Sequence, residues 1–251
     1  TLAVLGWVFL PIMGTLVTLW PTMLRTRLEP GAERRARMAL PVLVVGILVV
    51  TTAAASGLDR LGAAGVATLL LGGWLMAEPM VATVRRRPPE SFVAWSSLAG
   101  VTWLAVSLVG LGAAFVAGPV TALSGSAAPL LGAALVGGVL QVLLGSLSYL
   151  LPVMIGGGPA AARARAARVD RGMSARLVLL NTSLVFCVLP SPSAVRVLCS
   201  TLVLVAVAWT GLALADALRR HADRPGSAGA PAPTSSLQTR RTAGVVLALA
   251  G

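Results

Sequence analysis

Charged and hydrogen-bonding side chains are scarce in this chain of 251 residues, which has no lysine, eight acidic residues, one histidine and one tyrosine. Charged residues make up 11% of the sequence and hydrophobic residues 57%, whereas a soluble domain has roughly 25% charged residues. The mean hydropathy is +0.88. These shortages exclude an ordinary soluble domain, because too few polar side chains are present to cover its surface.

The sequence also lacks the motifs of several common enzyme classes. It contains no GxSxG, no GxxxxGK(S/T), no HExxH and no CxxC. Haem in a membrane bundle is normally ligated by histidines on facing helices, but the single histidine, His221, lies in the basic stretch RRHADR. We therefore assign no catalytic residue and no metal ligand to this chain.

Long apolar runs predict an all-α, polytopic transmembrane bundle, because a spanning helix needs about 20 largely apolar residues. The sixth run is short, so we expect Arg176 beside it to extend toward the membrane interface. A further run, 243–251, is expected to begin an eighth helix that is cut off by the end of the sequence. The seven predicted spans are Leu2–Leu24, Met38–Ser56, Leu61–Val84, Phe92–Val116, Leu130–Ile155, Leu177–Pro190 and Val197–Leu218.

Three regions follow from this pattern. Residues 1–224 form the predicted bundle, and residues 225–242 form a flexible cytoplasmic linker, since they include the Pro, Gly and Ser-rich stretch PGSAGAPAPTSSLQT. Residues 243–251 begin the further helix. Because Thr1 opens directly into an apolar run, we expect the chain to be an internal piece of a longer protein.

Arginines are distributed unevenly between the connections. Eighteen of the 20 lie in alternate connections, and only Arg60 and Arg196 lie in the others. The positive-inside rule places the arginine-rich set in the cytoplasm of a bacterial plasma membrane protein, so that the first helix begins outside. The formal net charge of +12 is thereby explained by topology, and we expect a lipid bilayer rather than nucleic acid as the partner.

Small residues recur at close to heptad spacing within the predicted helices. Gly65 with Gly72 and Gly138 with Gly145 are two such pairs. Glycines at this spacing allow neighbouring helix backbones to approach closely. The pairs therefore predict tight helix packing.

A stripe of polar and small residues follows one face of the fifth predicted helix, with Tyr149 beside it. Such a stripe lines a cavity or a cofactor edge in one interpretation. In the other, Gln141 is a buried amide that bonds to a neighbour such as Asn181 on the next helix. The stripe consists of Gln141, Gly145, Ser148 and Pro152.

Glu78 is the only acidic residue well inside an apolar run, and Pro79 follows it. Intramembrane carboxylates often mark proton or cation pathways. Glu78 is also close enough to the cytoplasmic end of its helix to pair with an arginine. Both interpretations remain open at this stage.

Cys187 and Cys199 lie on either side of one short outer connection. An oxidising exterior permits a disulfide between them, and soft thiolates can bind copper. Single buried cysteines more often serve as small apolar residues. The spacing alone does not separate these possibilities.

Three segments resemble a known family: LGWVFLPIMGTLVTLWPTMLRTR (Leu5–Arg27), PPESFVAWSSLAGVTWL (Pro88–Leu104) and QVLLGSLSYLLPVMIGGGP (Gln141–Pro159). They are similar to the membrane region of actinobacterial multicopper oxidase or copper nitrite-reductase-like proteins. In that family a bundle similar to haem-copper oxidase subunit I precedes an exported copper-binding domain with cupredoxin folds. The family's histidines lie in the helix before the LGW motif and its copper ligands in the exported domain, so no ligand can be assigned to a residue of this chain.

The resemblance implies the membrane domain of a copper-dependent oxidoreductase, with copper and possible haem in the parent protein. That domain would anchor an extracytoplasmic copper domain of the same chain and assist electron or proton transfer. The alternative is a small-solute transporter or permease in which Glu78 and the stripe on the fifth helix line one midplane site. A ligand-free scaffold is a third reading.

Overall fold

The fold was examined in a computed structural model, which describes all residues except 1–5, 7, 25, 27–28, 119–128 and 223–251. The described residues form helices and connections with no β-strand, which confirms the predicted all-α bundle. Its helices are α1 (Leu10–Met23), α2 (Ala32–Ser56), α3 (Asp59–Arg86), α4 (Phe92–Ala117), the π-helix η3 (Ala133–Leu140), α6 (Gln141–Met154), α7 (Gly158–Val169), α8 (Met173–Val188) and α9 (Ser193–Ala222).

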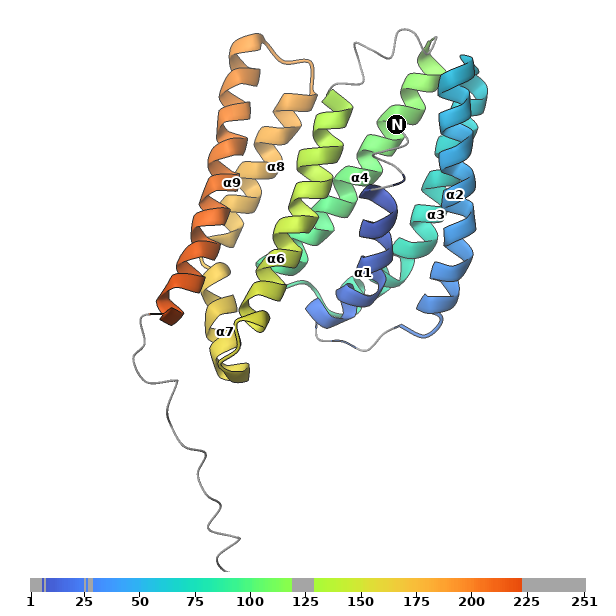
Figure 1. The fold of residues 1–251 in the computed structure, drawn as a ribbon. Helices are drawn as coiled ribbons and strands as arrows, with labels where there is room; N and C mark the ends of the chain where they lie inside the picture. The colour runs from blue at the N-terminus through green and yellow to red at the C-terminus, as the bar shows by residue number, and fades with distance from the viewer. Residues whose placement is uncertain (1–5, 7, 25, 27–28, 119–128, 223–251) are drawn as a thin grey trace, which may run out of the picture.

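Two helical hairpins flank a central pair of helices (Figure 1). Helices α2 and α3 pack along their whole lengths on one side, α8 and α9 pack on the other, and α4 with η3 and α6 lies between the hairpins. Helix α1 packs against α2, α3 and α4. The largest apolar core joins α1, α2, α3 and α4, and it includes Met13, Leu43, Val66, Leu69 and Leu108.

Each of the seven predicted spans overlaps a helix, and five helices are long and apolar enough to cross a membrane by themselves. These five are α2, α3, α4, α9 and the continuous segment Pro129–Met154, which contains η3 and α6. Helix α8 reaches the required length only together with α7, across a bend of 47°. The described part of α1 has 14 residues, so it spans about 21 Å at 1.5 Å per residue. The predicted eighth helix lies outside the described residues.

The predicted glycine contacts are confirmed. A Cβ added to Gly65 would lie 2.8 Å from the backbone nitrogen of Val50 on α2, and one on Gly145 would lie 2.7 Å from Ser97 Oγ on α4. A Cβ added to Gly72 would likewise collide with the Leu43 side chain, and one added to Gly138 would collide with the Leu104 side chain. Only hydrogen atoms fit at these contacts, so the α2–α3 and α4–α6 pairs approach as closely as small-residue membrane helices do.

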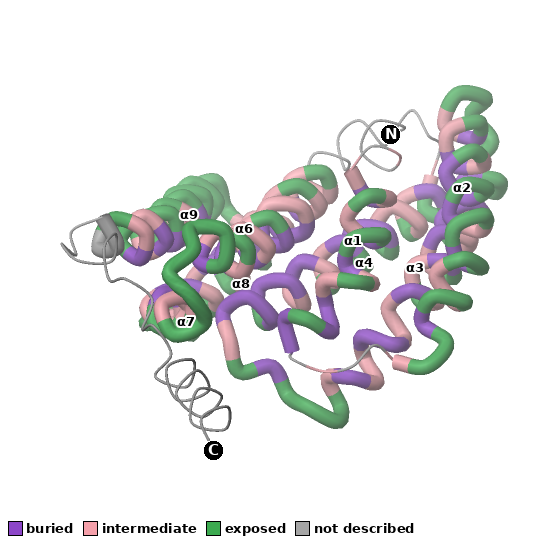
Figure 2. The backbone as a smooth tube through the Cα atoms, turned by 60° about the horizontal axis from the view of Figure 1, so that its bottom comes forward, coloured by how far each residue is buried: buried purple, intermediate pink, exposed green. Residues whose placement is uncertain are grey.

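Large apolar side chains cover the outer faces of the helices. The tube in Figure 2 is buried where helices face one another and exposed on the outer sides of α2 and α9. Leu48, Leu71, Trp74, Val109 and Leu204 are each more than half exposed. Apolar surface facing away from the core on every side of the molecule is what contact with a lipid bilayer requires.

The connections lie at two ends of the bundle. The end of α1, the start of α2 and the α3–α4 and α6–α7 connections lie with α7 at the lower end in Figure 1, and the α2–α3 and α8–α9 connections lie at the upper end. Arginines of α2, α3, α7 and α9 gather at the lower end, whereas Arg60 and Arg196 begin α3 and α9 at the upper end. We call the lower end the arginine-rich end.

One helix at this end was not predicted. The stretch between the fifth and sixth predicted spans, taken as a loop, contains α7, which begins at Gly158-Pro159 and ends before the α7–α8 bend at Asp170. Gly157 and Gly172 precede α7 and α8 with φ of 83° and 68°, left-handed values that favour glycine. Proline in the first turn of a helix is favoured because its missing N–H has no partner there.

Candidate functional site

The polar residues singled out from the sequence fall into separate places in the structure. Gln141 and Asn181 meet in an amide cluster within the bundle. Ser148 and Tyr149 lie two turns further along α6, at a cavity at the arginine-rich end. Glu78 lies apart from both, on α3.

The amide cluster joins α4, α6 and α8 through three hydrogen bonds between helices, and a fourth lies within α8. Gln141 Nε2 donates to Asn181 Oδ1 at 3.0 Å, and Asn181 Nδ2 donates to Gln141 Oε1 at 3.2 Å. Trp103 Nε1 also donates to Asn181 Oδ1, at 2.7 Å, and Asn181 Nδ2 donates to the Leu177 carbonyl at 2.8 Å. The hydrogen bond expected between Gln141 and Asn181 is therefore present.

Gln141 is fully buried where α6 crosses α4. Its exposed fraction is 0%, and its backbone carbonyl accepts a hydrogen bond from Ser96 Oγ at 2.7 Å. The side-chain amides satisfy each other, so no unpaired group points from this cluster into an open space. This arrangement suits helix-to-helix adhesion, because unpaired polar groups are costly in an apolar interior.

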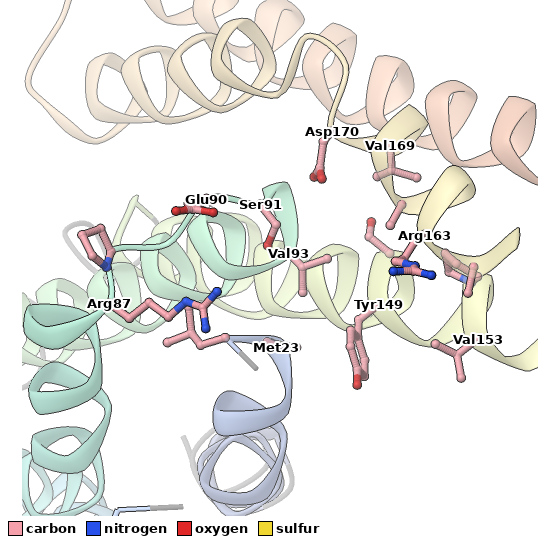
Figure 3. A pocket seen from close by; sticks show the side chains of 16 residues that line it. Met23, Arg87, Glu90, Ser91, Val93, Tyr149, Val153, Arg163, Val169 and Asp170 are labelled. Carbon is pink, nitrogen blue, oxygen red and sulfur yellow. The ribbon is translucent and has the colours of Figure 1, made fainter. Parts of the chain in front are cut away.

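A cavity of about 320 Å³ opens at the arginine-rich end between α1, α4, α6 and α7. Figure 3 shows Arg87 and Arg163 entering it from opposite sides, with Glu90 and Asp170 on one side in this view and Tyr149 on the other. Ser148 lines the cavity and is 1% exposed, and its Oγ has no hydrogen-bond partner. Ser148 and Pro152 of the predicted stripe thus line one cavity, whereas Gln141 does not.

Asp170 connects the α7–α8 bend to the start of α4. Its Oδ1 accepts a hydrogen bond from the Phe92 backbone N–H at 2.7 Å, and the Ser91 side chain accepts from the Ala94 N–H at 3.3 Å. These two acceptors cap the N-terminus of α4. Burial raises the pKa of the Asp170 carboxyl above its usual value, while the Phe92 N–H and the Arg176 guanidinium both act to lower it.

Arg176 does not extend to the interface as expected, because it is 1% exposed. Its guanidinium folds back to donate to the carbonyls of Val169 and Arg171, and its Cζ lies 4.7 Å from the centre of the Phe92 ring. The α7–α8 bend supplies these carbonyls and α4 supplies the ring, so the charge is held within the protein. Arg165 of α7 is similarly buried and donates to the Gly156 and Ala161 carbonyls.

Glu78 pairs with an arginine of the neighbouring helix. Its Oε2 lies 2.8 Å from Arg35 Nη1, without the alignment of a hydrogen bond, and both side chains are about two-fifths exposed. A second ion pair, Arg86 with Glu29 at 2.8 Å, lies at the same end. Glu78 was interpreted from the sequence either as part of a proton or cation pathway or as the partner of an arginine. The structure contains the arginine contact.

The two cysteines are free thiols in the structure. Cys187 Sγ lies 3.6 Å from Ser200 Oγ, and Cys199 is buried. Adjacent positions on a helix point about 100° apart, so the side of α9 that faces Cys187 is not the side that carries Cys199. The disulfide considered from the sequence is absent for this reason.

Trp103, Asp170, Arg165 and Arg176 were not identified from the sequence as members of a site. No polar stripe in the sequence includes Trp103. Its hydrogen bond to Asn181 forms only because α4 and α8 cross at that point. A signal for α7 was present, because alanine and arginine are strong helix formers and Gly158-Pro159 is a start signal.

The part of the chain that the structure describes contains no group of three or more His, Cys, Asp and Glu side chains that could hold a metal ion. The His221 side chain lies outside that part. No protein-family model, curated protein or solved structure matches this chain.

Proposed function

We propose that this chain is the membrane domain of a copper-dependent oxidoreductase, with its arginine-rich end in the cytoplasm, and that it anchors an extracytoplasmic copper domain. The observation that carries the anchoring role is the closed amide cluster of Gln141, Asn181 and Trp103. Polar groups that satisfy one another within a bundle stabilise it, and these three side chains leave no unpaired group for a solute at this point of the bundle. The copper-dependent class is supported by the resemblance of three segments to the family described above.

The transporter alternative requires Glu78 and the α6 stripe to line one midplane site. In the structure Glu78 faces Arg35 on α2, while Gln141 faces Asn181 on α8 and Ser148 lines a cavity that excludes Glu78. These residues do not share a site. The geometry therefore favours an anchoring domain over a permease.

The class of the parent protein is tested by expressing the full reading frame that encodes this chain. Purified protein would be analysed for copper by elemental analysis and for haem by an absorption scan. Copper bound in a fixed ratio to protein is the expected result. Protein that is folded, membrane-inserted and free of both copper and haem would contradict the copper-dependent class.

The orientation is tested by thiol labelling in intact cells, in a background with both native cysteines changed to serine. Arg163→Cys, at the arginine-rich end, should react with a membrane-impermeant maleimide only after the cells are opened. Arg60→Cys, at the other end, should react in intact cells. The reverse pattern would show that the arginine-rich end faces outward.

A further inference from the structure

The cavity at the arginine-rich end has the size and setting of a ligand site. Its volume of about 320 Å³ falls at the lower end of the range of about 300 to 1,000 Å³ for small-molecule pockets. It lies at the arginine-rich end, between the apolar helices α1, α4 and α6 and the arginine-bearing helix α7, and the positive-inside rule places such an end at the membrane interface. A ligand there can reach both water and lipid.

Opposite charges line the cavity without neutralising one another. Arg87 comes from the α3–α4 connection and Arg163 from α7, and the two side chains enter from opposite sides (Figure 3). Neither forms an ion pair within the described part of the chain, and neither does Glu90. Asp170, by contrast, is engaged with the Phe92 N–H. Arg163 Nε donates to the Pro159 carbonyl at 3.3 Å, so the terminal N–H groups of Arg163, the Arg87 guanidinium and the Glu90 carboxylate are available to a ligand.

The inner wall offers hydroxyl groups. Ser148 is almost fully buried and its Oγ lacks any partner, which is unusual because buried polar groups are normally hydrogen-bonded. Ser91 accepts from the Ala94 N–H, so its own O–H remains free to donate. A ligand oxygen in the cavity would satisfy these donors.

An apolar track leads away from the cavity along the end of α6. Pro152 and Val153 line the cavity itself, and Leu150, Val153 and Met154 have exposed fractions of 40%, 57% and 78%. Exposed apolar side chains next to a polar cavity at a membrane interface match an amphiphile that has a polar head and an acyl chain.

We propose that this cavity binds the headgroup of a phospholipid that carries both a phosphate and a primary ammonium group, of the phosphatidylethanolamine class. The phosphate contacts Arg87 and Arg163, the ammonium contacts Glu90, and an acyl chain follows the end of α6. Arginine is suited to phosphate because its guanidinium presents several donors in a plane. A purely anionic headgroup matches less well, since Glu90 would face it unpaired.

This inference depends on the chain lying in a membrane and not on the copper-dependent parent. Absence of copper would leave it intact, and absence of bound lipid would leave the copper proposal intact. The two experiments therefore fail independently.

Binding is tested with the purified chain in detergent, by native mass spectrometry with phosphatidylethanolamine, phosphatidylglycerol and phosphatidylcholine added singly. The first lipid should bind at least tenfold more tightly than the other two, which corresponds to about 1.4 kcal/mol. The double variant Arg87→Gln/Arg163→Gln should lose at least tenfold in affinity. Glu90→Gln should remove the preference over phosphatidylglycerol.

Two further variants separate the cavity from its surroundings. Ala166→Leu, on the cavity wall contributed by α7, should block binding without removing a charge. Arg85→Gln/Arg168→Gln removes two arginines at the same end that do not line the cavity, and it should bind like the wild type. Thermal unfolding followed by circular dichroism would confirm that each variant is folded.

Three results would overturn the proposal. The first is equal binding of all three lipids that the double variant leaves unchanged. The second is tighter binding of phosphatidylglycerol than of phosphatidylethanolamine, which would indicate an anion site. The third is competition by glycerophosphoethanolamine at the same concentration as the lipid, which would identify a soluble phosphate ester as the ligand.

Discussion

Removing the Asn181 side chain is expected to weaken the bundle more than removing any other single polar group described above. Asn181→Leu deletes four hydrogen bonds of the side chain, two with Gln141, one with Trp103 and one with the Leu177 carbonyl. Bonds of this kind in a membrane protein average about 0.6 kcal/mol, so their loss alone costs about 2 kcal/mol. The stranded amide of Gln141 and indole N–H of Trp103 add to this cost, because each unsatisfied buried group costs about 1–3 kcal/mol.

The partner substitution is expected to be milder. Gln141→Leu removes two bonds and leaves Asn181 bonded to Trp103 and to the Leu177 carbonyl, which gives a loss of about 1.2 kcal/mol on the same scale. The double variant should be less unstable than the sum of the single variants, because the two Gln141–Asn181 bonds are lost in each single variant and are therefore counted twice in the sum. A coupling of at least about 0.5 kcal/mol would exceed ordinary deviations from additivity.

The free energy of unfolding would be measured by titrating the chain in mixed micelles with sodium dodecyl sulfate and following tryptophan fluorescence. Thr102→Val is the matched control, because the Thr102 hydroxyl is exposed and bonds only to the Leu98 carbonyl of its own helix. A loss for Asn181→Leu no larger than that for the control would refute the reasoning. Additive effects of the two amide substitutions would refute it equally.

Three further predictions concern packing, pH and charge. Gly65→Ala should destabilise the bundle by about 1–3 kcal/mol, because the new Cβ would lie 2.8 Å from the Val50 nitrogen. Gly14→Ala is the control and should not destabilise it, because nothing lies within 4 Å of the new Cβ. Comparable losses for the two variants would contradict this prediction. Burial raises the pKa of Asp170 above 3.8, so the folded state holds the proton more tightly, and this carboxyl should lower the stability as the pH rises from about 4 through its folded pKa. Asp170→Asn should remove that dependence in a pH series of unfolding measurements, and an unchanged slope would show that another group titrates. Glu78→Gln should change the unfolding free energy by less than about 1 kcal/mol, since its ion pair is partly exposed; a loss of several kcal/mol would indicate a more deeply buried role.

The helices were predictable because contact with lipid requires long uninterrupted runs of apolar residues, which can be read directly from the sequence. Runs of about 20 apolar residues mark the spans, and Gly65 with Gly72 marks a close contact, since both features depend on position along one helix. The pairing of Gln141 with Asn181 was predictable for a related reason. Few amides lie inside the apolar runs, so each has few possible partners.

Features that depend on how separate helices meet were not predictable. Arg176 was expected to extend toward the interface, but the bend after α7 places the Val169 and Arg171 carbonyls beside it. The cavity required α1, α4, α6 and α7 to meet at one end, which no spacing within a helix records. The spacing of Cys187 and Cys199 likewise left a disulfide open, because it does not record which side of α9 faces α8.

The π-helical stretch η3 has a consequence for how the span Pro129–Met154 is read as a helical wheel. A π-helix closes its hydrogen bonds over i→i+5 rather than i→i+4, so each turn takes up about one residue more than in an α-helix. Over Ala133–Leu140 this difference accumulates, and the face carrying Gln141, Gly145 and Ser148 is out of phase with the residues before the stretch. A single wheel drawn at 100° per residue through the whole span would therefore place the residues before Ala133 on the wrong side relative to Gln141, Gly145 and Ser148.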